Sequence, residues 1–187
     1  MFNGEDISSL SEHQIVRRGI GRKFQVPAVF KDLTVRDNLE TSFGTRKDPF
    51  QNMTSFQRSN GLKRFDDVIG IIGLGDRMNT VAGVLSHGET QWLEIGMVLM
   101  QSPDLLLMDE PTAGMTEKET MKTSKIFNAL KGDHTLIVVE HDMSFVREIA
   151  DVITVMHQGK WLAEGGIEDI EKNPVVREVY LGAEGIH

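Results

Sequence analysis

Residues 105–111 read LLLMDEP, an apolar run that stops at two carboxylates and a proline. This pattern predicts a buried strand that delivers Asp109 and Glu110 to the carboxyl end of a parallel sheet, where open α/β sheets bind their ligands. A carboxylate in that position can hold Mg²⁺, and a second one can orient or deprotonate an attacking water. The stretch therefore indicates a magnesium–nucleotide site.

The other half of such a site is missing from the sequence. A phosphate loop has the pattern G-x-x-x-x-G-K-S/T. The only Gly-Lys pair of the chain, Gly159-Lys160, is followed by tryptophan and has no glycine at the required distance before it. Acidic residues also occur at strand ends simply because these ends are exposed to solvent. The two carboxylates alone are therefore compatible with a magnesium–nucleotide site and with ordinary surface acids.

The composition is that of a globular protein, and it disfavours several classes of function. A net charge of −8 and a pI near 5.2 disfavour a nucleic-acid surface, which needs clustered Lys and Arg. The chain has no cysteine, and its histidines do not have metal-ligand spacing. No apolar run reaches the roughly 18 residues that a membrane span needs.

Periodicity predicts an α/β core with a helical insertion. Capping-box spacing of Ser11 with Gln14 predicts a helix near 12–18, Thr34 and Asp37 are typical of a helix start, and a strand is expected over 20–25. The turn signal Asn3-Gly4 has an apolar segment on one side only, so we expect the chain to begin within a larger structure. Apolar runs at 104–108, 135–139 and 151–156, separated by helical stretches, predict a parallel sheet covered on both faces.

The segment LSHGE at 85–89 carries a second signal. Ser86 and Glu89 have capping-box spacing, and the N–H groups at a helix start suit a phosphate. Gly88 permits close approach of a ligand to the backbone. An ordinary capped helix explains this segment equally well by itself, but LSHGE is followed in order by a strand ending in DEP and another ending in EHD.

With this combination the chain resembles the ATP-binding subunits of ABC transporters. LSHGE is similar to their signature motif, LLLMDE to their Walker B strand, His141 to their switch histidine and Gln25 to their Q-loop glutamine. The stretches FQVPAVFKDLTVRDNL and EPTAGMT are similar to the branched-chain amino acid importers. QWLEIGM together with AGMT is most similar to the urea importer ATPase subunit.

The resemblance implies ATP and Mg²⁺ as ligands and a role for each matching residue. Asp109 would bind Mg²⁺, and Glu110 would polarise the hydrolytic water. Gln25 would sense Mg²⁺ and link the site to the membrane partner, and His141 would contact the γ-phosphate. The signature residues would contact ATP held by an opposing subunit in a head-to-tail dimer; they are Ser86, His87, Gly88 and Glu89.

The implied fold is a P-loop NTPase (RecA-like) ABC ATPase core that is truncated at its N-terminus and contains a helical subdomain. Residues 1–32 would hold the Q-loop part of the core, 33–102 the helical subdomain with the signature at its end, and 103–187 the Walker B, D-loop and H-loop. The implied partners are permease subunits and a second ATPase subunit, without nucleic acid. The implied location is cytoplasmic, peripheral at the inner face of the cell membrane.

Several features depart from the family pattern. His87 replaces glycine, Glu89 replaces glutamine, and Thr116 stands where many relatives have the D-loop aspartate. Because the phosphate loop is missing, we expect the chain to be the C-terminal part of such an ATPase and inactive alone. The lost strand would lie between residues 135–139 and 151–156, and its loss would leave unpaired strand edges and exposed apolar surface.

Two other functions fit part of the pattern. The chain could be a non-catalytic partner that offers its signature motif in trans to a complete ABC ATPase. The DNA-repair and chromosome ATPases share the signature, but they insert a long coiled coil before it, whereas Gln25 and Ser86 are only 61 positions apart. The predicted function is therefore the ATPase subunit of an importer for urea or branched-chain amino acids.

Overall fold

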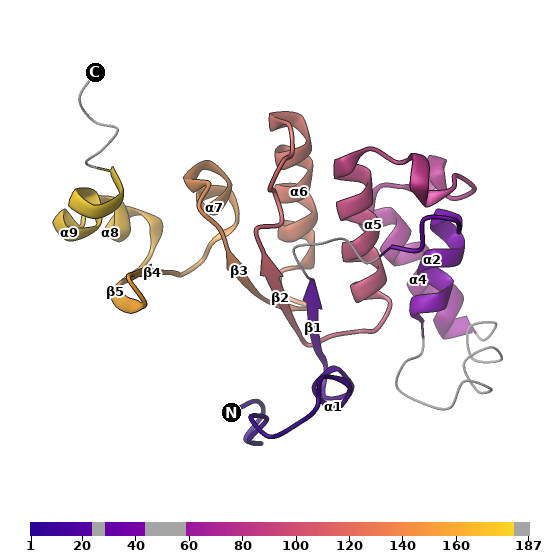
Figure 1. Cartoon of the computed structure of the whole chain (residues 1–187), viewed down its shortest axis with the longest axis horizontal. Helices are drawn as coiled ribbons and strands as arrows, with labels where there is room; N and C mark the ends of the chain where they lie inside the picture. Colours follow the sequence, from indigo (N-terminus) through magenta and orange to yellow (C-terminus); the bar gives the residue numbers. More distant parts are fainter. Residues whose placement is uncertain (24–28, 44–58, 182–187) are drawn as a thin grey trace. The chain divides into compact units, whose positions relative to one another are not determined.

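The computed structural model describes residues 1–23, 29–43 and 59–181, so the predicted Gln25 lies outside the described residues. The chain forms two compact units, Met1–Glu140 and His141–His187, which are described separately (Figure 1). The three-part functional division into 1–32, 33–102 and 103–187 stays a prediction. The first unit contains α1 (Glu12–Arg17), β1 (Ile20–Lys23), α2 (Val35–Ser42), α4 (Ser59–Ile72), η1 (Gly75–Arg77), η2 (Ala82–Val84), α5 (His87–Leu99), β2 (Leu105–Asp109), α6 (Glu117–Leu130) and β3 (Thr135–Val139).

The predicted helix starts are confirmed. Thr34 and Ser86 each form a complete capping box at the start of α2 and α5, and at the start of α1 the Ser11 N–H donates to Gln14 Oε1 at 2.9 Å. Asn3 and Gly4 form a turn with φ of 48° and 80°, and the strand pairing beside it is an isolated bridge between Phe2 and Glu5. Local capping chemistry is thus sufficient to place these helix boundaries.

The strands β1, β2 and β3 form a parallel sheet in that order, as Figure 1 shows. Leu106 and Met108 of β2 are buried at 0% and 2% exposure, as expected for the central strand of an α/β core. Helix α5 packs on β1 so closely that a Cβ on Gly21 would lie 2.5 Å from Val98. A buried ion pair, Lys23 to Glu94 at 3.5 Å, also joins these two elements.

A helical group of α2, α4 and α5 packs beside the sheet. A Cβ on Gly96 of α5 would lie 2.7 Å from Ile72 of α4 and 3.0 Å from Leu39 of α2, so the glycine permits a close approach of the three helices. The predicted helical insertion therefore has a buried apolar core, and α5, the helix that begins with LSHGE, contributes to this core.

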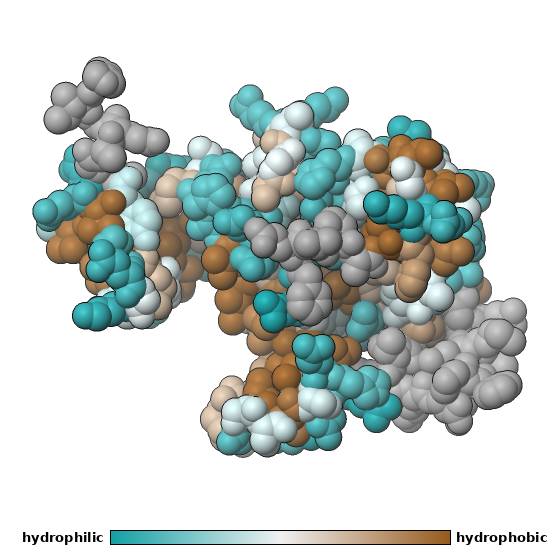
Figure 2. Space-filling model, viewed as in Figure 1, coloured by the Kyte–Doolittle hydropathy of each residue, from teal (hydrophilic) through white to brown (hydrophobic). Residues whose placement is uncertain are grey.

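The expectation of a sheet covered on both faces is wrong for β3. Among the described residues β3 is the last strand of the sheet, and Ile137 and Val139 are 53% and 61% exposed. Figure 2 shows hydrophobic residues at the surface over this strand. An apolar strand at a sheet edge is a surface that can pair with another chain.

The second unit contains α7 (Met143–Ile149), β4 (Ile153–His157), β5 (Lys160–Gly165), α8 (Ile167–Lys172), α9 (Pro174–Val176) and η3 (Arg177–Leu181). The run at 151–156 was expected in the parallel sheet, but β4 pairs antiparallel with β5. The reason is the two-residue turn Gln158-Gly159, whose φ values of 49° and 73° are those of a hairpin turn. The only Gly-Lys pair of the chain thus belongs to a hairpin and its adjoining strand.

A small core of Ala163, Ile170 and Val176 holds the second unit together. Among the helices that the structure describes, none is long and apolar enough to cross a membrane.

Candidate functional site

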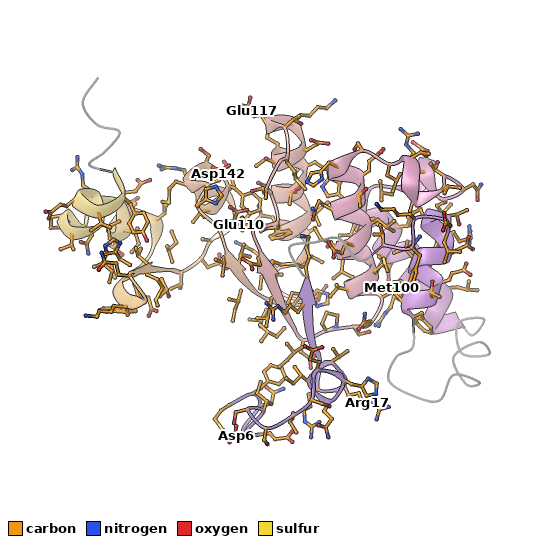
Figure 3. The ribbon with its side chains drawn as sticks, viewed as in Figure 1. Asp6, Arg17, Met100, Glu110, Glu117 and Asp142 are labelled. Atoms are coloured by element: carbon orange, nitrogen blue, oxygen red, sulfur yellow. The ribbon has the colours of Figure 1, made fainter. Side chains whose placement is uncertain are left out.

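Asp109 and Glu110 lie at the carboxyl end of the central strand, as predicted. Asp109 ends β2 opposite Val139 of β3, and the backbone N–H of Glu110 donates to the Val139 carbonyl at 2.9 Å. Glu110, labelled in Figure 3 just beyond β2, has φ of 43°, which is uncommon for a residue with a Cβ. Backbone strain of this kind gathers at functional sites, where the surrounding structure holds it in place.

The loop after Glu110 is fixed by Glu140, an acid at the end of β3. The Glu140 carboxylate accepts from the Thr112 N–H at 3.1 Å and also from the Thr112 hydroxyl. The sequence placed Glu140 at a strand end but did not reveal this contact. Glu140 therefore holds the segment that follows the two carboxylates of β2.

The start of α5 is a capping box with an ion pair beside it. The Ser86 N–H donates to Glu89 at 2.9 Å, and the Glu89 N–H donates to Ser86 Oγ at 3.2 Å. Arg77 donates to the other oxygen of Glu89 at 3.0 Å. The hydrogen bond from the Ser86 backbone holds the pKa of Glu89 below its ordinary value, and Arg77 adds to this effect. Both oxygens of the Glu89 carboxylate therefore accept hydrogen bonds at or beside the start of its own helix.

His87 connects this helix start with the loop after β2. Its Nε2 lies 2.9 Å from the carbonyl oxygen of Ala113. Because a carbonyl oxygen only accepts, Nε2 carries the proton in this contact. The histidine that replaces the family's glycine thus has a structural partner in the segment anchored by Glu140.

A second capping box, at the start of α6, was not singled out from the sequence, although its signal T-x-x-E is present at 116–119. The Thr116 N–H and hydroxyl donate to Glu119 Oε2 at 2.9 and 2.8 Å. The Glu119 carboxyl also lies against Gly88: a Cβ on Gly88 would be 2.4 Å from Glu119 Oε1. Hydrogen bonds from the N–H and the hydroxyl of Thr116 lower the pKa of Glu119, and the neighbouring Gly88 N–H adds to this effect.

The predicted site residues fall into three groups. Six of them lie within the first unit: Ser86, His87, Gly88, Glu89, Asp109 and Glu110. His141 is the first residue of the second unit, and Asp142, labelled in Figure 3, caps α7 by accepting from the Ser144 N–H at 2.9 Å. Gln25 falls outside the described residues.

The residues at the end of β2 fit a magnesium–nucleotide site better than a site built by protein alone. No group of three or more metal-binding side chains occurs within residues 1–23, 29–43 and 59–181. Mg²⁺ in nucleotide sites takes one or two carboxylates and completes its shell with phosphate oxygens and waters. Asp109, half-buried at the end of β2, can provide such a ligand.

Comparison with known proteins places this geometry in a family. The family model described as ABC transporter matches residues 1–113. The high-affinity branched-chain amino acid transport ATP-binding protein BraF of Pseudomonas aeruginosa is 36% identical, over 97% of this chain and 74% of that protein. The probable branched-chain amino acid transport ATP-binding protein LivG of Archaeoglobus fulgidus is 34% identical, over 98% of this chain and 73% of that protein.

Solved structures agree with this assignment. MJ1267, an ATP-binding cassette of an ABC transporter, matches with a TM-score of 0.79 and 27% identity, over 96% of this chain and 75% of that chain. CbiO1 from Clostridium perfringens, part of the ABC transporter complex cbiONQ, matches with a TM-score of 0.75 and 26% identity, over 97% of this chain and 71% of that chain. The predicted fold class, the P-loop NTPase core of an ABC ATPase, is confirmed, and the chain belongs to the ABC transporter family of ATPases.

Proposed function

We propose that this chain is the ATP-binding subunit of an ABC importer and couples ATP hydrolysis to the uptake of a small solute. The observation that carries the proposal is one connected arrangement in the first unit. Two carboxylates end the central strand, and the loop after them contacts the start of α5 through His87 and Ala113. This arrangement joins the predicted magnesium and water-activating groups to the predicted signature motif.

In this proposal Asp109 holds Mg²⁺, which when bound neutralises charge on the nucleotide phosphates. Glu110 orients the attacking water. Its backbone position is fixed by the Val139 carbonyl and its left-handed conformation, so the carboxylate needs little reorganisation to act. His141 contacts the γ-phosphate, and Gln25 reports on Mg²⁺ to the membrane partner.

The signature motif serves a second subunit in a head-to-tail dimer. Ser86 Oγ already accepts from the Glu89 N–H, and its own O–H can donate to a phosphate oxygen. The positive end of the α5 dipole adds to this attraction. Ser86 and Gly88 would then bind the γ-phosphate of ATP held by the opposing subunit.

An apolar surface on the first unit supports the permease as a partner. Phe30, Val81 and Val84 are 55%, 42% and 76% exposed. They lie on adjoining segments, because the Gly83 N–H donates to the Lys31 carbonyl at 2.9 Å and Thr34 forms a bridge with Val81. We propose that this surface contacts permease subunits at the inner face of the cell membrane.

The transported solute is proposed to be a branched-chain amino acid or urea. The first is supported by relatives of 34–36% identity that are branched-chain amino acid transport ATP-binding proteins. The second is supported by QWLEIGM at 91–97 and AGMT at 113–116. Competition between unlabelled leucine and urea in an uptake assay separates the two.

The 187 residues alone are proposed not to hydrolyse ATP, because they contain no G-x-x-x-x-G-K-S/T pattern to cradle the β- and γ-phosphates. The test is titration of the purified chain with Mg-ATP in a calorimeter, with free phosphate followed in the same sample. Sustained release of phosphate would contradict this part of the proposal.

Uptake tests the function as a whole. In cells whose uptake depends on a protein that contains these 187 residues, Glu110→Gln should reduce transport about a hundredfold or more, because it removes the group that orients water while keeping its volume. Ser86→Ala should also reduce transport. If Glu110→Gln leaves uptake unchanged and Ser86→Ala abolishes it, the chain is instead a non-catalytic partner that offers its signature in trans. If neither substitution changes uptake, the proposed function is wrong.

A further inference from the structure

The two carboxylate oxygens of Glu119 face the starts of two different helices. Oε2 accepts from the N–H and the hydroxyl of Thr116, at the start of α6. Oε1 lies against Gly88, in the first turn of α5, where an added Cβ would come within 2.4 Å of it. One anion that belongs to the chain itself therefore lies at the helix start to which the proposed function assigns phosphate binding.

A carboxylate and a phosphate compete for the same feature of a helix start. Both are attracted by the positive end of the dipole, and both accept from backbone N–H groups of the first turn. Glu119 Oε1 lies against Gly88, and the Gly88 N–H is one of the causes, after the groups of Thr116, that lower the pKa of the Glu119 carboxyl. A phosphate oxygen that approaches Gly88 must therefore displace Glu119 or share its donor.

The charge around this turn makes the competition stronger. Glu89 already contributes a carboxylate at the same helix start, and it has a cationic partner, Arg77, at 3.0 Å. Glu119 has its hydrogen bonds from Thr116, and its second oxygen lies against Gly88. Glu119, from the first turn of α6, adds a second carboxylate beside the start of α5, which opposes the binding of a further anion, and it is the one that lies against Gly88 itself.

We propose that Glu119 is a positioning residue of the signature motif: it occupies the Gly88 position as a resident anion and lowers the affinity of the α5 start for phosphate until it is displaced. The inference rests on the proposed function, since it concerns the same phosphate-binding turn. It adds Glu119, a residue from outside LSHGE, and proposes that this residue sets how tightly the start of α5 binds phosphate.

The test uses the whole 187-residue chain, labelled with ¹⁵N and titrated with inorganic phosphate and with ATP while the Gly88 and Glu89 amide signals are followed. Glu119→Gln keeps capping-box spacing but removes the charge, and Glu119→Ala also removes the contact with Gly88. The matched control is Glu117→Gln, which removes the same charge from the same helix turn at an exposed position (Figure 3). Thermal unfolding of each variant establishes that it is folded.

Glu119→Gln is expected to tighten phosphate binding about two- to fivefold relative to Glu117→Gln, and Glu119→Ala at least as much. Equal affinities for Glu119→Gln and Glu117→Gln would overturn the proposal, as would the lack of any phosphate response in every variant. The outcome is separable from the function tested by uptake. If Glu119→Gln and Glu117→Gln bind phosphate equally and uptake still depends on Glu110, only the role of Glu119 is rejected. If Glu119→Gln binds phosphate more tightly but uptake does not respond to Glu110→Gln, only the importer function is rejected.

Discussion

The starts of α5 and α6 have the same local structure and different surroundings. Each has a hydroxyl residue at the N-cap and a glutamate three positions later, and the N-cap N–H donates to that glutamate at 2.9 Å in both. Glu89 turns its second oxygen to Arg77, on a neighbouring segment, whereas the second oxygen of Glu119 lies against Gly88 of the other helix start. The same capping motif therefore ends in a surface ion pair in one case and in a contact with a proposed ligand site in the other.

The largest effect is expected where the bodies of the two helices meet. Trp92 of α5 is 7% exposed, its indole N–H donates to Thr123 Oγ1 of α6 at 3.0 Å, and Lys122 Nζ lies 3.6 Å from the ring centroid. Trp92→Ala should lower the free energy of unfolding by about 3–5 kcal/mol, as measured by urea denaturation. Trp92→Phe, which keeps an aromatic ring, should cost less than half as much. A loss below about 1 kcal/mol for Trp92→Ala would mean that the helices do not depend on this contact.

The two capping hydroxyls should contribute equally to stability. Ser86→Ala and Thr116→Ala each remove the N-cap acceptor of one helix, and each should lower the free energy of unfolding by about 0.5–2 kcal/mol. Thr116→Ser keeps the acceptor and is the control, with a change of a few tenths of a kcal/mol expected. Urea midpoints measure all three. If one alanine variant is as stable as the wild type, the two helix starts are not equivalent.

Sequence reasoning reached the parts of this comparison that are local. The box at Ser86 was predictable because Glu89 lies three positions away and both partners are on the same helix. The contact between His87 and Ala113 joins residues 26 positions apart, and that between Trp92 and Thr123 joins residues 31 positions apart. No spacing rule connects such pairs, because they meet only after the helices have packed.

The same distinction applies to the sheet. Each apolar run became a strand, because a strand needs only its own side chains to be recognised. The partner of β4 was predicted incorrectly, although the Gln158-Gly159 turn that decides it was present in the sequence. The position of Asp109 and Glu110 was predictable because the end of a strand is a local feature, whereas the anchoring contact of Glu140 depends on the neighbouring strand.

A smaller effect separates the two glutamates by their sensitivity to salt. Arg77 is 54% exposed at its side chain, so its pair with Glu89 should show a coupling energy of only about 0.2–1 kcal/mol. A double-mutant cycle of Arg77→Gln and Glu89→Gln at low salt should detect it, and the coupling should be mostly lost at 1 M salt because of screening. The matching cycle of Thr116→Ala and Glu119→Gln should change less with salt, because its interaction is a hydrogen bond to a hydroxyl. Equal salt dependence of the two cycles would remove the distinction.

The finest distinction is in the titration of the two carboxyls. The pKa of both Glu89 and Glu119 is lowered from the ordinary value of 4.5. Each carboxylate therefore stabilises the folded state at pH values above 4.5, and this contribution is lost as the pH falls through the pKa of the folded state. The largest cause of the lowered pKa is the Thr116 N–H for Glu119 and the Ser86 N–H for Glu89; the Thr116 hydroxyl adds to the first and Arg77 to the second. Thr116→Ala should therefore raise the carboxyl midpoint of Glu119 toward 4.5 and leave that of Glu89 unchanged, and Arg77→Gln should do the reverse.

Carboxyl ¹³C NMR between pH 2 and 7 measures both midpoints in one sample, so each glutamate is the control for the other. If both substitutions shift both midpoints alike, the two helix starts form one electrostatic unit, and the separate roles assigned to Glu89 and Glu119 are wrong.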